Sequence, residues 1–176
     1  MLKLKNISLD ISKIHNESDY YINIRILFEK ISFSNNVCYW NAYGKEESLV
    51  QIGLLNPIGA IYKIICFLHP TITHKIISDS TIIYANVPEK IGLPLFETYL
   101  EKYQMGYYHI DENINFEVYI STKNTTILFS SNTVTLHVIN DPIIFGFDQN
   151  NNLCYIHIKN MILNEEDFLE EYTFKK

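Results

Sequence analysis

Alternation of apolar and polar side chains is the strongest pattern at the start of the chain. From Leu2 to Ile11 apolar residues recur with a spacing close to two, which predicts a strand with a bulge after Lys5. Residues 20–33 fit both a strand and a helical stripe, and their many β-branched side chains favour the strand. Further strands are expected at residues 37–43, 48–52, 71–77 and 81–87.

The segment that follows Asn56 has the features of a helix start. Asparagine caps helices, and Pro57 suits the first helical position because a proline lacks the N–H that would have no partner there. The apolar residues within 58–68 follow helical spacing, and Pro70 limits the end of the element. Although Gly59 is unfavourable inside a helix, a helix is expected between these two prolines.

Two more helices are expected towards the end of the chain. Pro94 opens the first of them, whose apolar face runs through residues 95–103 and whose stop is Gly106. The other begins at Asn164, a good capping residue followed by three carboxylates that favour the positive end of a helix dipole.

The last third of the chain reads as a series of short alternating strands. Apolar residues alternate within the segments 116–120, 127–129, 134–138, 143–147 and 154–158. Turn-forming residues separate these segments, and such short connections favour an antiparallel meander. The sequence therefore predicts an α+β fold, in which an antiparallel sheet with a C-terminal meander is packed by two or three helices. A single domain spanning residues 1–176 is expected.

Composition narrows the class of partner. The chain is 47% hydrophobic and carries a net charge of −6 with Arg25 as its only arginine, so direct nucleic-acid binding is not expected. An acidic surface suits a basic protein partner; the alternative explanation is that the negative charge only keeps the protein soluble. Three widely spaced cysteines without a C-x-x-C pair indicate buried free thiols and a reducing compartment. With no signal peptide and no apolar stretch long enough to span a bilayer, a cytoplasmic location is expected.

Residues that carry catalysis do not form a known motif in this chain. Phosphate-binding loops, dinucleotide-binding fingerprints, zinc-protease motifs and nucleophile elbows are all missing, so no catalytic residue, cofactor or metal ligand is predicted. His69 and His74 lack a third ligand at suitable spacing. His137 and His157 lie in expected strands and alternate against apolar neighbours, which predicts that both face solvent and would share a site if their strands were adjacent.

Two groups of residues are candidates for contacting a partner. The first combines tyrosines, which are enriched at interfaces, with two acids; the second is the acidic part of the last expected helix. The first group is Tyr103, Tyr107, Tyr108, Asp111 and Glu112, and the second is Glu165, Glu166, Asp167, Glu170 and Glu171. The alternative interpretations are core packing for the tyrosines and a solvated helix face for the acids.

The end of the chain resembles a known class of proteins. Residues 143–148, an asparagine-rich turn, residues 153–158 and the segment 164–168 are similar to the tail of small bacterial immunity proteins paired with polymorphic toxins, including those of contact-dependent growth inhibition. The resemblance covers about the last quarter of the chain. It implies a cytoplasmic protein that binds a cognate toxin domain, often a basic nuclease, and blocks its active site or substrate surface.

Two other functions fit the same sequence. One is an interaction or accessory module of a phage or a secretion system, which the neighbouring genes would distinguish from an immunity protein. The other is an enzyme with an unfamiliar site built on His137 and His157, which requires both rings in one pocket with perturbed pKa values.

Overall fold

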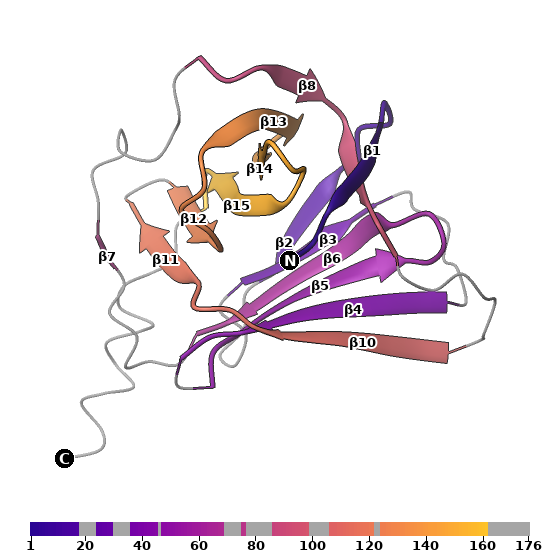
Figure 1. Ribbon diagram of the computed structural model, residues 1–176, viewed down its shortest axis with the longest axis horizontal. Helices are drawn as coiled ribbons and strands as arrows, with labels where there is room; N and C mark the ends of the chain where they lie inside the picture. Colours follow the sequence, from indigo (N-terminus) through magenta and orange to yellow (C-terminus); the bar gives the residue numbers. More distant parts are fainter. Residues whose placement is uncertain are drawn as a thin grey trace.

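Strands form all the regular structure in the described part of the chain. The computed structural model describes residues 1–17, 24–29, 36–45, 47–68, 75–76, 86–98, 106–121 and 124–161. Within these ranges the chain contains no helix and forms two β-sheets (Figure 1). The predicted α+β class is therefore wrong for the described residues, which have an all-β fold. Among the described strands, the larger sheet contains one parallel pair and the smaller sheet two, so neither is the purely antiparallel sheet that was expected.

The larger sheet has eight strands. They are β1 (Leu4–Ser8), β2 (Ile14–Glu17), β3 (Ile24–Phe28), β4 (Asn36–Tyr43), β5 (Leu49–Leu55), β6 (Ala60–Phe67), β9 (Leu93–Phe96) and β10 (Gly106–Asn113). The main order is β1-β9-β6-β5-β4-β10, with β3 also paired to β6 and β2 paired to β3. Strands β4, β5 and β6 form an antiparallel meander, whereas β10 lies parallel to β4.

The second sheet has seven strands and curls around itself (Figure 1). They are β7 (Lys75–Ile76), β8 (Glu89–Ile91), β11 (Glu117–Ile120), β12 (Asn124–Leu128), β13 (Val134–Asn140), β14 (Ile143–Asp148) and β15 (Leu153–Lys159). The expected C-terminal strands are confirmed, but they are not a simple meander. The order is β7-β11-β12-β15-β14-β13-β8, so β12 pairs with β15 and not with the next strand along the chain.

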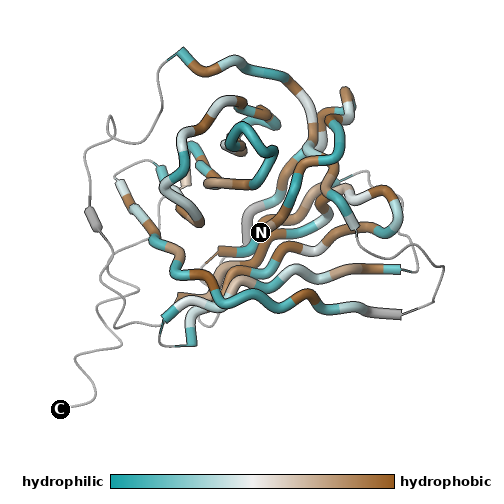
Figure 2. The backbone as a smooth tube through the Cα atoms, viewed as in Figure 1, coloured by the Kyte–Doolittle hydropathy of each residue, from teal (hydrophilic) through white to brown (hydrophobic). Residues whose placement is uncertain are grey.

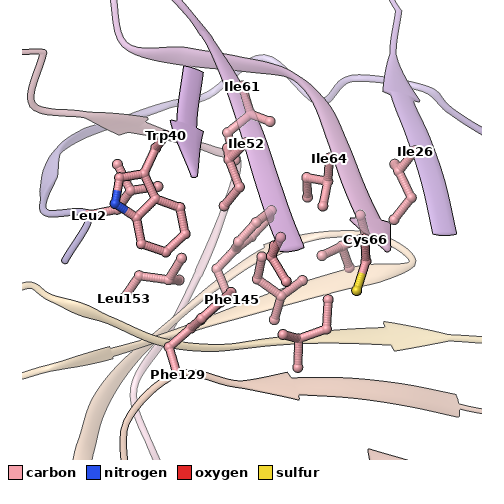
Figure 3. Packing of buried hydrophobic residues seen from close by; sticks show 14 of the residues in the cluster. Leu2, Ile26, Trp40, Ile52, Ile61, Ile64, Cys66, Phe129, Phe145 and Leu153 are labelled. Atoms are coloured by element: carbon pink, nitrogen blue, oxygen red, sulfur yellow. The ribbon is translucent and has the colours of Figure 1, made fainter. Parts of the chain in front are cut away.

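One hydrophobic core lies between the two sheets (Figure 3). Trp40 from β4 is fully buried and packs edge-on against Phe129 from the curled sheet, with ring centroids 5.5 Å apart. Phe96 and Phe147 form a tilted ring contact across the sheets, with ring centroids 6.0 Å apart. Truncating a buried aromatic ring of this kind costs about 3–5 kcal/mol, so these contacts contribute strongly to holding the sheets together.

A bulge explains why β6 looks helical in the sequence. The segment after Asn56 forms a turn through Pro57 and Gly59, and the chain then continues as a strand. Leu54 pairs with Ile61 and Gly53 with Lys63, so Tyr62 is an extra residue in the ladder. The bulge therefore places both Ile61 and Ile64 in the core, three positions apart, which imitates helical spacing. The expected helix is wrong for this reason.

The helix expected from Pro94 is also wrong at its start. Residues 93–96 form β9, which pairs antiparallel with β1 from Leu4 to Ser8. Pairing satisfies the backbone groups of both strands, and it takes precedence over the local helical spacing of the apolar residues. Residues 99–105 and the helix expected from Asn164 lie outside the described residues.

Several other predictions are confirmed. A register shift between Leu4 and Asn6 places the bulge of β1 at Lys5, as the alternation predicted. The ambiguous segment 20–33 contains the strand β3 in its described part. Strands β4 and β5 match the expected strands at 37–43 and 48–52, whereas most of residues 71–77 and 81–87 lies outside the description.

Candidate binding surface on the eight-stranded sheet

Strand alternation gives the eight-stranded sheet two unlike faces. One face is apolar and packs on the curled sheet. The opposite face is called the outer face here. Its members in the central strands and β10 include Arg25, Leu27, Tyr39, Asn41, Gln51, Tyr62, Lys63, Ile65, His109, Asp111 and Asn113. Figure 2 shows hydrophilic positions along much of β10 at the rim, whereas β5 and β6 inside the sheet are richer in hydrophobic ones. The outer face therefore combines polar groups with aromatic rings.

Asn41 connects three strands of the outer face through its side-chain amide. Its Nδ2 donates to Asp111 Oδ1 at 2.7 Å and lies 3.2 Å from His109 Nδ1. Its Oδ1 accepts a hydrogen bond from Gln51 Nε2 at 3.0 Å. Asn41 is only 2% exposed, and these three contacts supply hydrogen-bond partners to both its amide nitrogen and its amide oxygen. Because an amide N–H only donates, this arrangement makes Nδ1 the accepting nitrogen of His109.

Aromatic rings extend the same surface towards β6. Tyr39 stacks on His109 with ring centroids 5.2 Å apart, and Tyr62 OH donates to Tyr39 OH at 2.8 Å. Lys63 Nζ lies 4.6 Å from the centroid of the Tyr39 ring, a cation–π contact. Burial, and then the nearby charge of Arg25, lower the pKa of Lys63.

Gly53 is the residue that lets Tyr62 lie flat on the sheet. A Cβ atom at this position would sit 2.4 Å from the Tyr62 ring and 2.9 Å from Lys63 Cγ. The bulge at Tyr62 and the missing side chain at Gly53 thus act together to bring Tyr62 next to Tyr39.

The predicted tyrosine and acid group does not form one surface. Asp111 is exposed on the outer face. Glu112 points to the opposite side, where its Oε1 accepts a hydrogen bond from Trp40 Nε1 at 2.9 Å and its Oε2 contacts the amino group of Met1. Tyr108 shares the side of Glu112, because the two residues lie four positions apart in the strand and even separations return a side chain to the same side. The period of two therefore separates Asp111 from both of them.

The remaining predicted contact residues lie wholly or partly outside the described structure. Tyr107 belongs to β10 through its backbone, but its side chain is outside the described structure. Tyr103 and the acidic group Glu165, Glu166, Asp167, Glu170 and Glu171 lie in ranges that the structure does not describe. Contact between these residues and a partner stays a prediction.

Sequence reasoning missed most of the outer face. Tyr39 and Asn41 alternate with apolar neighbours in an expected strand, so the sequence alone could have placed both on one face. Their partners could not be found in this way, because His109 follows them by about 70 residues and reaches them only through the parallel pairing of β10 with β4. Tyr62 was hidden by the bulge that made its segment look helical.

His137 and His157 lie on one face of the curled sheet, but neither faces solvent. They are 2% and 4% exposed, so the prediction of solvent-facing histidines is wrong. Both histidines lie on the face of the curled sheet that carries a second hydrophobic cluster, where His137 contacts Tyr155 and His157 pairs with Ile144. Strand β14 lies between their strands, so they are not on adjacent strands.

Each of these imidazoles has its own hydrogen-bond partner. Tyr155 OH lies 2.6 Å from His137 Nε2, and the ring of Tyr155 reaches it across Gly146, where a Cβ atom would be 2.3 Å from that ring. Thr126 Oγ1 lies 2.8 Å from His157 Nδ1, while His157 Nε2 is buried and has no hydrogen-bond partner among the described residues.

Burial lowers the pKa values of both histidines. For His137 the charge of Glu89 acts in the opposite direction without outweighing burial. For His157 the charges of Lys159 and His137 add to the effect of burial. Both rings are therefore held neutral in the folded protein near neutral pH.

Asp148 and the three cysteines stabilise the fold: Asp148 by hydrogen bonds in a turn, and the cysteines by packing in the interior. Asp148 accepts hydrogen bonds from the backbone of Asn150 and Asn152 and from two asparagine side chains, as expected for an acid in a turn. Burial acts to raise the pKa of Asp148, but these hydrogen bonds outweigh it and the pKa lies below its usual value. The three cysteines are free and buried, as predicted. Burial raises the pKa of Cys154 to about 11.

No group of three or more potential metal ligands occurs among the residues described above. Within the same ranges, no helix is long and apolar enough to cross a membrane. The chain matches no protein-family model and no curated protein.

Proposed function

We propose that this protein binds and neutralises a bacterial toxin domain, as the immunity proteins that its last quarter resembles do. It acts by occupying a surface of the toxin and not by catalysis. The observation that carries the proposal is the outer face, where Tyr39, Tyr62 and His109 lie among hydrogen-bonded polar groups on a rigid sheet.

The composition of the outer face supports binding to a protein. Tyrosine offers a large apolar ring with a polar tip, and it is enriched among the few interface residues that contribute most of the binding energy. Half-buried rings such as Tyr39 and Tyr62 are already fixed by contacts with Lys63 and with each other. Binding then orders few side chains, which reduces the entropy lost when a complex forms.

Charge supports a basic partner. The chain carries a net charge of −6, and Asp111 is exposed on the outer face. Domains that act on nucleic acids carry lysine and arginine side chains that contact phosphates. Carboxylates of this protein are suited to occupy such positions, because complementary potentials favour both encounter and specificity. The proposed target is therefore a basic toxin domain, with a nuclease as the leading class.

Location in the cytoplasm belongs to the same proposal. Cys38, Cys66 and Cys154 are free and buried, which fits a compartment that keeps thiols reduced. An intracellular toxin target also requires its inhibitor to be present where the toxin arrives.

Co-purification with the C-terminal domain encoded by the adjacent gene tests the proposal. Wild-type protein should form a stoichiometric complex with that domain. Tyr39→Ala should weaken the complex by about thirtyfold or more, the effect typical of an interface residue that dominates binding. The matched control is Tyr119→Ala, because Tyr119 is a half-buried tyrosine on β11 of the curled sheet.

Two results would count against the proposal. The absence of a complex, with folded wild-type protein, would remove the toxin-binding function. Equal weakening by Tyr39→Ala and Tyr119→Ala would remove the outer face as the contact surface.

A further inference from the structure

We propose that the partner binds by adding an extended, basic strand to the free edge of β10. This inference rests on the proposed function and specifies how the partner is held. Strand addition of this kind uses backbone hydrogen bonds for affinity and alternate side chains for specificity.

The pairing of β10 shows which of its backbone groups are available. Strand β10 pairs with β4 over all eight of its residues, from Gly106 to Asn113, without a register shift. Ile114 N donates to Tyr43 O at 2.9 Å, so the even-numbered residues of this segment direct their N–H and C=O groups towards β4. The odd-numbered residues direct theirs away from the sheet. Figure 1 shows β10 at the rim, next to β4.

Three consecutive outward positions are free of backbone partners within the described structure. His109, Asp111 and Asn113 each present an N–H and a C=O to the outside, and β10 has no second neighbouring strand in the described ranges. The same residues are exposed and direct their side chains to the outer face. A strand added here would thus continue both the hydrogen-bond ladder and the outer face.

The other edges of the two sheets are less suited to strand addition. Among the described strands, β1 has five residues and a bulge, β2 has four residues, β8 has three and β7 has two. Proteins commonly protect exposed edges in such ways, or with proline and lysine. Strand β10 is longer than these strands, and its eight residues contain no proline, no lysine and no bulge.

Charge identifies the occupant as a basic segment. Strand β10 contains Asp111 and Glu112 and no lysine or arginine. A partner strand with lysine or arginine at alternate positions would place its cations beside Asp111 on the outer face. A second copy of this chain would instead bring β10 against β10, and the like charges of the two strands would oppose that pairing.

A pair of substitutions at His109 tests the backbone contact directly. His109→Ala and His109→Pro both remove the imidazole, but only the proline also removes the outward N–H. Proline is tolerated on an edge strand where its nitrogen faces solvent, so both variants should keep the fold, as thermal unfolding would verify. Binding is measured by calorimetry against the C-terminal domain encoded by the adjacent gene. His109→Pro should bind about tenfold or more weakly than His109→Ala, because a ladder hydrogen bond and strand register are lost.

A separate substitution, at Asp111, tests the contribution of charge to binding. Asp111→Asn keeps the backbone N–H and removes one carboxylate, so its affinity should fall and depend less on salt than that of the wild type. Equal affinities of His109→Pro and His109→Ala, with Tyr39→Ala still defective, would overturn strand addition and leave the proposed function intact. If the free wild-type protein dimerises and His109→Pro does not, the β10 edge binds a second copy of this chain and not a basic partner strand. No binding by the wild type would overturn both.

Discussion

At the scale of single residues, burial decides the protonation of the two histidines in the curled sheet. His137 and His157 are buried beside Tyr155 and Thr126, and their pKa values are lowered. The folded state therefore binds fewer protons than the unfolded state in weak acid. Stability from these groups is fully present above the unfolded pKa of about 6.5 and is lost as pH falls towards the folded pKa values.

Replacing His157 with glutamine tests this linkage. The wild type should lose free energy of unfolding below about pH 6.5, by up to about 1.4 kcal/mol per pH unit for each histidine. His157→Gln should show a shallower loss between pH 6.5 and 5 in urea unfolding, because one titrating group is gone. His15→Gln, which changes an exposed histidine, is the control. An unchanged pH slope in His157→Gln would contradict the argument.

At the scale of elements, glycines and bulges set the geometry that the strands cannot supply alone. Gly59 has a φ of 78° in the turn between β5 and β6, and a Cβ atom there would lie 1.9 Å from the backbone oxygen of Phe96. Phe96 N in turn donates to Gly59 O at 2.8 Å. The turn and β9 are therefore in direct backbone contact, and only glycine fits between them.

Substituting Gly59 should be costly for this reason. Gly59→Ala should lower the free energy of unfolding by about 2–3 kcal/mol, since it adds both an unfavourable φ and a backbone clash. Ile58→Ala, at an exposed neighbouring position, should change it by less than about 0.5 kcal/mol. Denaturant titration of the three proteins measures the differences, and a Gly59→Ala variant as stable as the wild type would refute the role of this contact.

The same elements show what the sequence could and could not predict. Strands that are rich in apolar residues and bounded by turn-forming residues, such as β14 and β15, were found from the sequence pattern alone. Strand β6 was not, because a bulge at Tyr62 changed its apparent period. The parallel pairing of β10 with β4 also left no local signal, since the alternation within each strand is the same whichever strand lies beside it. Most of the outer face depended on these two features.

At the scale of the whole molecule, one core joins the two sheets. Trp40 contacts Phe129 across the interface, and Cys66 lies in the same cluster with no exposed surface. Burial raises the pKa values of all three thiols, so they should not react with thiol reagents while the protein is folded. Since the sheets share this core, they should unfold together.

Coincident transitions would confirm this coupling. Emission of Trp40 and labelling of the three cysteines should change at the same urea concentration. Phe129→Ala should shift both transitions together, by about 3–5 kcal/mol. Thiol labelling that precedes the change in Trp40 emission would instead indicate that the two sheets unfold separately.

Hydrogen exchange of the free and bound protein would show directly where the partner binds. The partner is the C-terminal domain encoded by the adjacent gene, and the observable is the exchange rate of each backbone amide. Binding at the outer face and the β10 edge predicts new protection at His109, Asp111 and Asn113, with smaller changes along β4 and none in β13 to β15. Protection confined to the curled sheet, with β10 unchanged, would contradict the account.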